Sequence, residues 1–305
     1  MAINKIEYGQ IMQKRLDQNA VIKSVSGWME ANAGEVIYTG GNEIKIPTMS
    51  TSGLADYDRD KGYVQGGITV SYETYKMTQD RGRTFNIDAM DEDDSNFVAT
   101  ATNAIKVFQD NHVIPEVDSY RHSAIAAAAE KAGQKEAIAL TSANVLSKLL
   151  EHIRTVQDII GYEKELVITI SGAAWGLLNE NDKISKYVMP QDFKKGEINT
   201  RIYTIDNNKI IACPQTRFMT KYKQNDGVTT GQEAGGLVPT DDAKKIQWII
   251  TPKTVPLAVS KTDKMRIFTP DENQQANAYK VDYRIYHDLW VKKNDTKSIF
   301  LCTEA

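Results

Sequence analysis

The feature that most constrains the fold is residues 46–88, a long stretch with too few aliphatic side chains to form a core of its own. Its first half contains TMSTSGLADYDRDKGYVQGG, which is rich in Gly, Ser, Asp and Tyr. Ile68, Val70 and Tyr72 then alternate with polar residues, which predicts a strand with one apolar face, and Gly82 is expected to turn the chain. A lone two-stranded hairpin is marginal in water, and a structureless loop of this length is unusual in a compact domain. We therefore expect an extended hairpin that lies on a partner.

Composition and charge place the chain among ordinary globular proteins. Its 305 residues are 41% hydrophobic and 25% charged, which is enough for one large or two ordinary domains. The formal net charge of -3 argues against a dedicated nucleic-acid binder, although one surface can still lie against DNA. No apolar run approaches the ~20 residues that span a bilayer, and the start MAINKIEYGQ lacks the apolar core of a signal peptide. We expect a soluble, intracellular protein in which Cys213 and Cys302 are buried free thiols.

Hydrophobic spacing predicts the elements of the N-terminal half. Helical spacing runs through residues 1–32, and the Gly-Gly pair in EVIYTGGNEIKIP supplies the positive φ of a tight hairpin turn. An apolar stripe that starts at Phe97 predicts a helix of about 20 residues. Pro115 should break or bend this helix, after which helical spacing resumes as far as Gly133.

The C-terminal half predicts alternating helices and strands. An amphipathic helix fits residues 142–160, ELVITIS is typical of a buried strand, and GAAWGLLNEN of a short helix. A hairpin is expected in TRIYTIDNNKIIACP, then a polar, Gly-rich excursion at residues 221–243 and a strand at KIQWIITP. The stretch AYKVDYRIYHDLWV alternates apolar and polar side chains, which predicts a last long strand before a turn at KKNDTK.

An acidic cluster in residues 88–94 is the first candidate for chemistry. Its members are Asp88, Asp91, Glu92, Asp93 and Asp94. An EF-hand that begins at Asp91 lacks the glycine and glutamate that its loop requires, and a glycosidase-type carboxylate pair needs partners that spacing does not supply. Helix initiation accounts for all five, because Asp88 or Asp91 can cap the helix and the dipole favours acids in its first turn. We therefore expect a helix start and no structural metal here.

Other catalytic and cofactor motifs are missing from the sequence. The four histidines, His112, His122, His152 and His287, form no metal-binding pair, and we expect YHD at 286–288 to be a strand-end turn. There is no GxGxxG or phosphate loop, the glycine that a nucleophile elbow needs before Ser171 is absent, and Cys213 has no neighbouring base. These observations predict a protein that is not an enzyme and carries no cofactor.

The order of the segments resembles the major capsid proteins of tailed bacteriophages, which have the Hong Kong 97-like fold. The resemblance is carried by GLADYDRDKGYVQG, SYETYKMTQDRGRTFNIDAMDEDD, VFQDNHVIPEVDSYR and TPDENQQANAYKVDYRIYHDLWV, in that order. It implies an α+β fold with an N-terminal arm at residues 1–45 and an extended β-hairpin loop at 46–88. It further implies a peripheral domain with a long spine helix at 89–145, an inserted axial domain at 146–264, and a return to the peripheral domain at 265–305.

The resemblance also implies a function. A chain of this family self-assembles as hexamers and pentamers into an icosahedral head, a virion capsid that encloses double-stranded DNA without sequence specificity and is built in the bacterial cytoplasm. A portal and, because the arm is short, a separate scaffolding protein are the implied partners. The same fold builds encapsulin-type nanocompartments, which remain an alternative, and a hydrolase that uses Asp88 to Asp94 is a remote one. Lys61 is expected to be an ordinary solvated lysine.

Contacts between subunits are expected along the extended loop. Its apolar face can be buried on a neighbour, and its charged residues can pair with opposite charges there. The predicted assembly contacts are Asp56, Asp58, Arg59, Asp60, Lys61, Ile68, Val70, Tyr72, Arg81 and Arg83.

Overall fold

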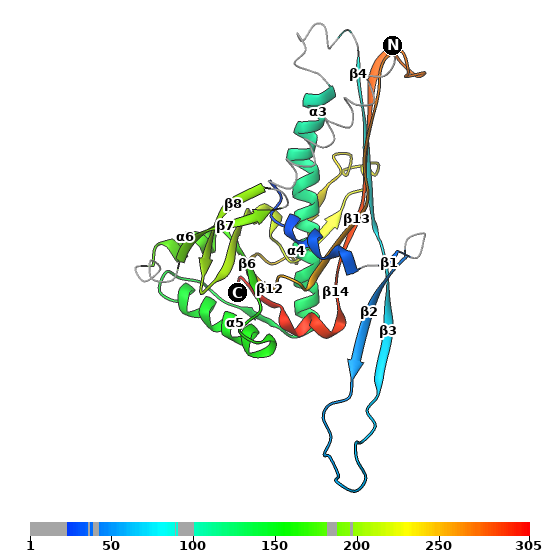
Figure 1. Cartoon of the computed structure of the whole chain (residues 1–305). Coiled ribbons are helices and arrows are strands. Elements are labelled where there is room, and N and C mark those ends of the chain that lie inside the picture. Colours follow the sequence, from blue (N-terminus) through cyan, green and yellow to red (C-terminus); the bar gives the residue numbers. More distant parts are fainter. Residues whose placement is uncertain are drawn as a thin grey trace.

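The computed structural model describes residues 23–35, 37–38, 43–88, 90, 101–181, 188–195 and 198–305. Figure 1 shows a sheet with its helices on one side of a long helical column, and a hairpin that points away from both. Helices and mostly antiparallel strands alternate along the described chain, which confirms the expected α+β class.

The larger sheet holds one of the two main cores. Among the described residues, seven strands pair in the order β5-β15-β12-β6-β9-β8-β7. They are β5 Lys135–Ala137, β6 Leu166–Ser171, β7 Val188–Lys195, β8 Ile198–Ile205, β9 Asn208–Cys213, β12 Ile246–Pro252 and β15 Phe300–Thr303. The helices α5 Val145–Ile160 and α6 Gly172–Asn179 contribute Leu149 and Leu178 to a core with Ile168 and Trp248. The buried strand, the short helix and the amphipathic helix expected in this half are confirmed.

The second layer is a long, narrow sheet beside a helical column (Figure 1). Its described strands pair in the order β13-β14-β4, from β13 Pro256–Phe268 through β14 Ala278–Val291 to β4 Gln79–Asp88. The column consists of α3 Ala101–Phe108, a π-helical turn η2 Gln109–Val113, and α4 Ile114–Lys131. Val113 and Val117 on the column pack against Tyr283 of β14, so the column and the sheet share a small core.

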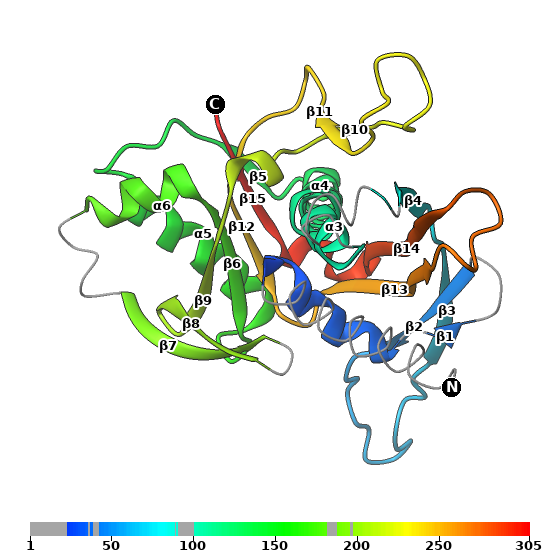
Figure 2. The ribbon, with the colours of Figure 1, turned by 90° about the horizontal axis from the view of Figure 1, so that it is seen from above.

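The break or bend predicted near Pro115 is not found, because the helical column continues through this point and changes only its hydrogen-bond pattern. Pro115 stands in the first turn of α4 and has no N–H to donate, while the residue before α4, Val113, is already helical, so the column continues through this point. The preceding five residues form the π-helical turn, and the amide of Ile114 donates to the carbonyl of Gln109. Figures 1 and 2 both show α3 and α4 following one common direction, so the pattern of hydrogen bonds changes without a sharp bend.

Short elements complete the described chain. They are η1 Gly27–Glu35, β1 Ile37–Tyr38, η4 Gln215–Arg217, β10 Tyr222–Gln224, β11 Leu237–Pro239 and η5 Lys293–Ser298. The hairpin expected in TRIYTIDNNKIIACP is confirmed, because β8 pairs with β9 and the turn residues Asp206 and Asn207 have positive φ. Most of the expected helix in residues 1–32 lies outside the described residues, and its described end is the 3₁₀-helix η1.

Two sequence expectations about the long sheet are wrong. Gly82 does not turn the chain; it lies inside β4, opposite Arg284, and a Cβ there would stand 2.8 Å from the carbonyl oxygen of Tyr283. Its absent side chain allows close contact between strands and therefore does not indicate a turn. The YHD segment is likewise no strand-end turn, since His287 pairs with Gln79 on one side and Ser260 on the other.

The N-terminal segment is held on α4 by one buried carboxylate. Asp118 accepts hydrogen bonds from the hydroxyls of Ser24 (2.8 Å) and Ser26 (2.6 Å) and from the amides of Val25 (3.1 Å) and Ser26 (3.0 Å). Arg217 lies 3.3 Å from its other oxygen. Burial acts to raise the pKa of Asp118, but the surrounding charge and these hydrogen bonds outweigh it and hold that pKa below its ordinary value.

Removing this carboxylate should destabilise the folded chain. We expect Asp118→Ala to lower the free energy of unfolding by about 3–5 kcal/mol at pH 7, because several buried donors and Arg217 lose their partner. Because the folded-state pKa is depressed, the stabilisation is complete above the unfolded value near 4 and is lost as pH falls through the folded-state value. Urea unfolding followed by tryptophan fluorescence at pH 7 and at pH 3 measures both effects.

The matched control for this experiment is a partly exposed carboxylate on the same column, whose side chain is 21% exposed. Asp110 pairs with Lys23, whose side chain is 47% exposed, so Asp110→Ala should cost less than about 1 kcal/mol. A loss for Asp118→Ala as small as that for Asp110→Ala would contradict the anchoring role.

Candidate functional site

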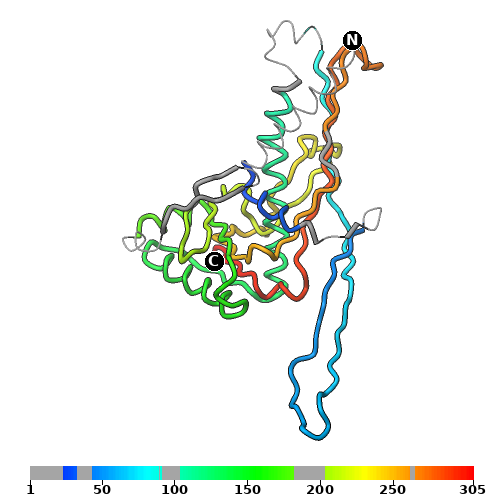
Figure 3. Tube along the Cα trace, viewed as in Figure 1, coloured from blue at the N-terminus to red at the C-terminus, as the bar shows by residue number. Residues whose placement is uncertain are grey.

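The most prominent surface is a two-stranded hairpin that leaves the body of the molecule. Its strands β2 Glu43–Thr51 and β3 Ile68–Lys76 pair along their whole length, and β1 adds a short pair with β2 at Ile44 and Lys45. Figure 3 shows residues 43–76 as a blue and cyan extension with no other part of the chain beside its far half. An extended hairpin is thus present, as the sequence predicts, but its paired strands span residues 43–76 and not 46–88, because residues 79–88 pair with β14 in the long sheet.

The two faces of this hairpin differ in chemistry. Directly opposite residues share a face, so the pairs Met49–Val70 and Pro47–Tyr72 lie on one side together with Ile68. These side chains are exposed: Met49 by 65%, Ile68 by 72%, Val70 by 51% and Tyr72 by 57%. The intervening pairs carry hydroxyl groups and lie on the other side. They are Thr48–Ser71 and Ser50–Thr69. The hairpin therefore presents an apolar face and a hydroxyl face, and its own chain leaves the apolar one uncovered.

The tip of the hairpin is ordered by local contacts. One carboxylate oxygen of Asp58 accepts the amide hydrogens of Asp60 (2.8 Å) and Lys61 (3.3 Å), and Gly62 closes the turn with φ +78°. The rings of Tyr57 and Tyr63 meet across it with centroids 4.9 Å apart. Local hydrogen bonds and one ring pair thus give the tip a defined shape.

The root of the hairpin is fixed in the body of the protein. Met77 is buried in a core with Ile44 and Ile46, and its carbonyl accepts a hydrogen bond of 3.2 Å from the hydroxyl of Tyr286. The next residue, Thr78, donates through its amide (2.8 Å) and its hydroxyl (3.0 Å) to the buried carboxylate of Asp288. The root of the hairpin is therefore fixed by buried contacts, and the part of the hairpin that carries the exposed apolar face projects from this root.

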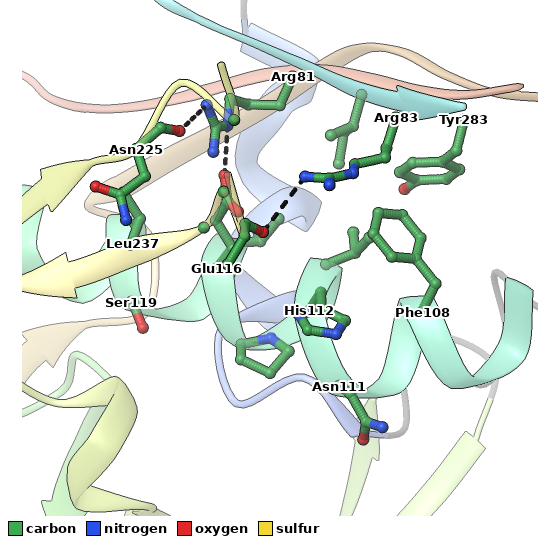
Figure 4. A pocket seen from close by; sticks show the side chains of 18 of the residues that line it. Arg81, Arg83, Phe108, Asn111, His112, Glu116, Ser119, Asn225, Leu237 and Tyr283 are labelled. Atoms are coloured by element: carbon green, nitrogen blue, oxygen red, sulfur yellow. Dashed lines mark hydrogen bonds and ion pairs between the residues drawn. The ribbon is translucent and has the colours of Figure 1, made fainter. Parts of the chain in front are cut away.

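A pocket of about 710 Å³ lies between β4, the helical column and the loop that joins β10 to β11 (Figure 4). Arg81 donates to the carboxylate of Glu116 (2.6 Å) and to the carbonyl of Asn225 (3.0 Å). Arg83 donates to the carbonyls of Glu233 (3.1 Å) and Ala234 (3.3 Å). Both arginines thus tie the polar excursion predicted at residues 221–243 to strand β4.

The ten residues predicted as assembly contacts therefore fall into different places. The three apolar residues of β3 share one exposed face, and the charged residues of the tip are exposed. Arg81 and Arg83 lie on β4 and bind groups of their own chain, because β4 belongs to the long sheet and not to the hairpin. An inter-subunit role for the residues of the hairpin stays a prediction.

The acidic and thiol side chains that the sequence offered as candidates for catalysis form no common site among the described residues. Asp88 ends β4 and one of its carboxylate oxygens accepts the amide of Met90 at 2.9 Å, as a helix cap would, while residues 91–94 lie outside the described residues. Within the described ranges, no group of three or more His, Cys, Asp or Glu side chains is arranged to hold a metal ion. Burial raises the pKa of both free thiols, that of Cys302 to about 12 and that of Cys213 further, so neither is an activated nucleophile.

Comparison with known proteins gives a result at the level of structure alone. Neither a protein-family model nor a curated protein matches the sequence.

In the part of the chain that the structure describes, no helix has both the length and the apolar character to cross a membrane.

Solved structures of capsids match most of the chain. The capsid of the cyanophage P-SCSP1u matches with a TM-score of 0.57 and 13% identity, over 88% of this chain and 85% of that one. The mature capsid of bacteriophage PhiM1 matches with a TM-score of 0.56 and 12% identity, over 88% and 84%. A virus-like particle from Pyrococcus furiosus matches with a TM-score of 0.52 and 12% identity, over 97% and 99%. The chain therefore has the α+β fold of phage capsid proteins, as the resemblance in its sequence implied.

Proposed function

We propose that this chain is the major capsid protein of a tailed bacteriophage, which assembles as hexamers and pentamers into an icosahedral head around double-stranded DNA. The observation that carries the proposal is the projecting hairpin, whose apolar face is left exposed by its own chain. Exposed side chains that follow one another on a single face of a strand are typical of an interaction surface. The capsid fold supports the same conclusion, since chains of the matched structures form capsids or a virus-like particle.

We take a second copy of the chain as the partner of this surface, because chains of the matched structures form capsids or a virus-like particle. A strand pair ordered at its tip and fixed at its root has already lost much of its conformational freedom, so docking costs little further ordering entropy. The exposed residues Met49, Ile68, Val70 and Tyr72 lie in one row, so a neighbour can cover them together. A separate scaffolding protein and a portal complete the proposed assembly, and the virion capsid is the proposed location.

Adjacent residues on opposite faces of β3 give a direct test of the apolar face. Val70→Asp should leave the subunit folded, because Val70 is half exposed, but should block shell formation, because each interface would bury an unpaired carboxylate. Ser71→Asp, one residue along and on the hydroxyl face, is the matched control and should assemble. Negative-stain microscopy and sedimentation velocity of both variants measure the outcome, and equal assembly by the two would contradict the proposed interface.

Hydrogen exchange tests whether the hairpin gains protection from a neighbour. Amides of residues 43–76 should exchange more than tenfold slower in shells than in free subunits, which corresponds to about 1.4 kcal/mol of added protection. Amides of the buried strand β6 should be protected in both states. Deleting residues 54–66 should leave a soluble, folded subunit that assembles poorly. Equal exchange of the hairpin in both states would show that its own chain orders it.

The contents of purified particles distinguish a phage head from a nanocompartment. Particles isolated from infected cells should contain nuclease-protected double-stranded DNA, whose length is set by the capsid volume and not by a sequence preference. Nuclease digestion followed by gel electrophoresis of the particle contents measures this. Particles that hold a protein cargo and no DNA would favour the nanocompartment alternative, and a chain that stays monomeric at high concentration would contradict both shell functions.

A further inference from the structure

The pocket beside Arg81 and Arg83 has an apolar floor formed by aromatic side chains. Phe85 of β4, Phe108 at the end of α3 and Tyr283 of β14 line it together, with ring centroids 4.8 Å apart for Phe85 and Phe108 and 5.8 Å for Phe108 and Tyr283. The pocket volume of about 710 Å³ is within the roughly 300–1,000 Å³ of pockets that bind small ligands. The floor can therefore accept an aromatic or aliphatic group.

Arg83 brings an uncompensated positive charge to the same pocket (Figure 4). Its guanidinium binds the two backbone carbonyls of Glu233 and Ala234, and no carboxylate among the described residues lies within ion-pair distance of it. Its neighbour Arg81 differs, because Glu116 already neutralises it. A guanidinium has five N–H donors, so Arg83 retains donors for an anion after both carbonyls are bound.

The other charged groups around the pocket do not take this role. Arg217 is paired with the buried Asp118. The pKa of His287 is lowered to about 3 by burial and by the charges of Arg121 and Arg81, so its imidazole is neutral near pH 7.

The one further carboxylate that lines the pocket is already bound within its own loop. Asp226 accepts hydrogen bonds from the amides of Val228 and Thr229 at 2.8 Å each, and from the hydroxyl of Thr229. These bonds lower the pKa of Asp226 to about 2, so it stays ionised and directed at its own turn. Arg83 and His112 are the remaining basic side chains of the lining, and of the two only the guanidinium of Arg83 is always charged.

We propose that this pocket binds a ligand that carries a carboxylate next to an aromatic or aliphatic group, with the carboxylate on Arg83 and the apolar group against Phe85 and Phe108. The ligand is either a free aromatic acid or an acidic, aromatic side-chain pair of a partner protein, since both present the same chemistry. The loop between β10 and β11 lies across the helical column from η1 and the hairpin (Figure 2). The proposal goes beyond shell formation and does not depend on it.

Binding of a matched pair of probes to the whole 305-residue chain tests the carboxylate. Isothermal titration calorimetry should show N-acetylphenylalanine binding at least about tenfold more tightly than the uncharged N-acetylphenylalaninamide, because a hydrogen bond to a charged group is lost with the amide. The peptide acetyl-Asp-Phe-Asp-amide forms the second arm. Tighter binding of the peptide identifies a partner protein as the source, and tighter binding of the free acid identifies a small molecule. Equal binding of acid and amide, or binding of none of the three probes, overturns the proposal.

Substitutions at Arg83 test whether the carboxylate of the ligand binds there. Arg83→Gln should weaken the acid at least about tenfold, and Arg83→Lys, which keeps the charge, should weaken it less. Arg154→Gln, an exposed arginine of α5 outside the pocket lining, is the matched control and should bind as the unchanged chain does. Thermal unfolding and shell formation of each variant are measured alongside. Unchanged binding by Arg83→Gln would overturn the proposal, and it would leave the shell function untouched if that variant still assembles.

Discussion

The structure depends on one constraint: a two-stranded hairpin cannot bury its own apolar face. Each residue fixed in a strand loses roughly 1–2 kcal/mol of conformational entropy, and a hairpin with one layer has no second layer to offset this loss by burial. Other contacts hold the hairpin at both of its ends. At the root, Met77 enters a core and Thr78 binds Asp288, while at the tip Asp58 and the pair Tyr57–Tyr63 hold the turn. The tip keeps its shape although its side chains are exposed, and the apolar face in the middle of the hairpin is left without cover, which makes it a contact for another molecule.

The sequence could predict this hairpin because the signal is local. Alternation of Ile68, Val70 and Tyr72 with polar residues needs no tertiary contact to be seen, and neither does the poverty in aliphatic side chains around it. Pro115 is a weaker local signal, because a proline is tolerated in the first turn of a helix, and the column continues through it. The hairpin was predictable from local signals, whereas the expected break of the helix was not found.

The parts that could not be predicted depend on neighbours that are distant in sequence. Glycine is common in turns, yet Gly82 lies inside a strand. Its role is set by the carbonyl of Tyr283, which is about two hundred positions away in the sequence and is brought close by strand pairing. The partners of Arg81 and Arg83 come from α4 and from the loop between β10 and β11, and no spacing rule connects these segments. The buried Asp118 shows the same limit, since in the sequence it is an ordinary acid on a helix.

Strand β4 connects the hairpin to the pocket. Side chains along a β-strand point alternately to its two faces, and this alternation decides which residues of β4 face the pocket. Arg81 and Arg83 are two residues apart, so both side chains leave the same face of the sheet, toward Glu116 and the loop between β10 and β11. Gly82 stands between them on the opposite face, where the absence of a Cβ allows β14 to approach. The same strand begins directly after Thr78, the residue that fixes the hairpin root on Asp288. A shift of β4 along β14 by one residue would therefore displace the root and turn both arginines away from the loop, so one register holds the hairpin and the pocket in place together.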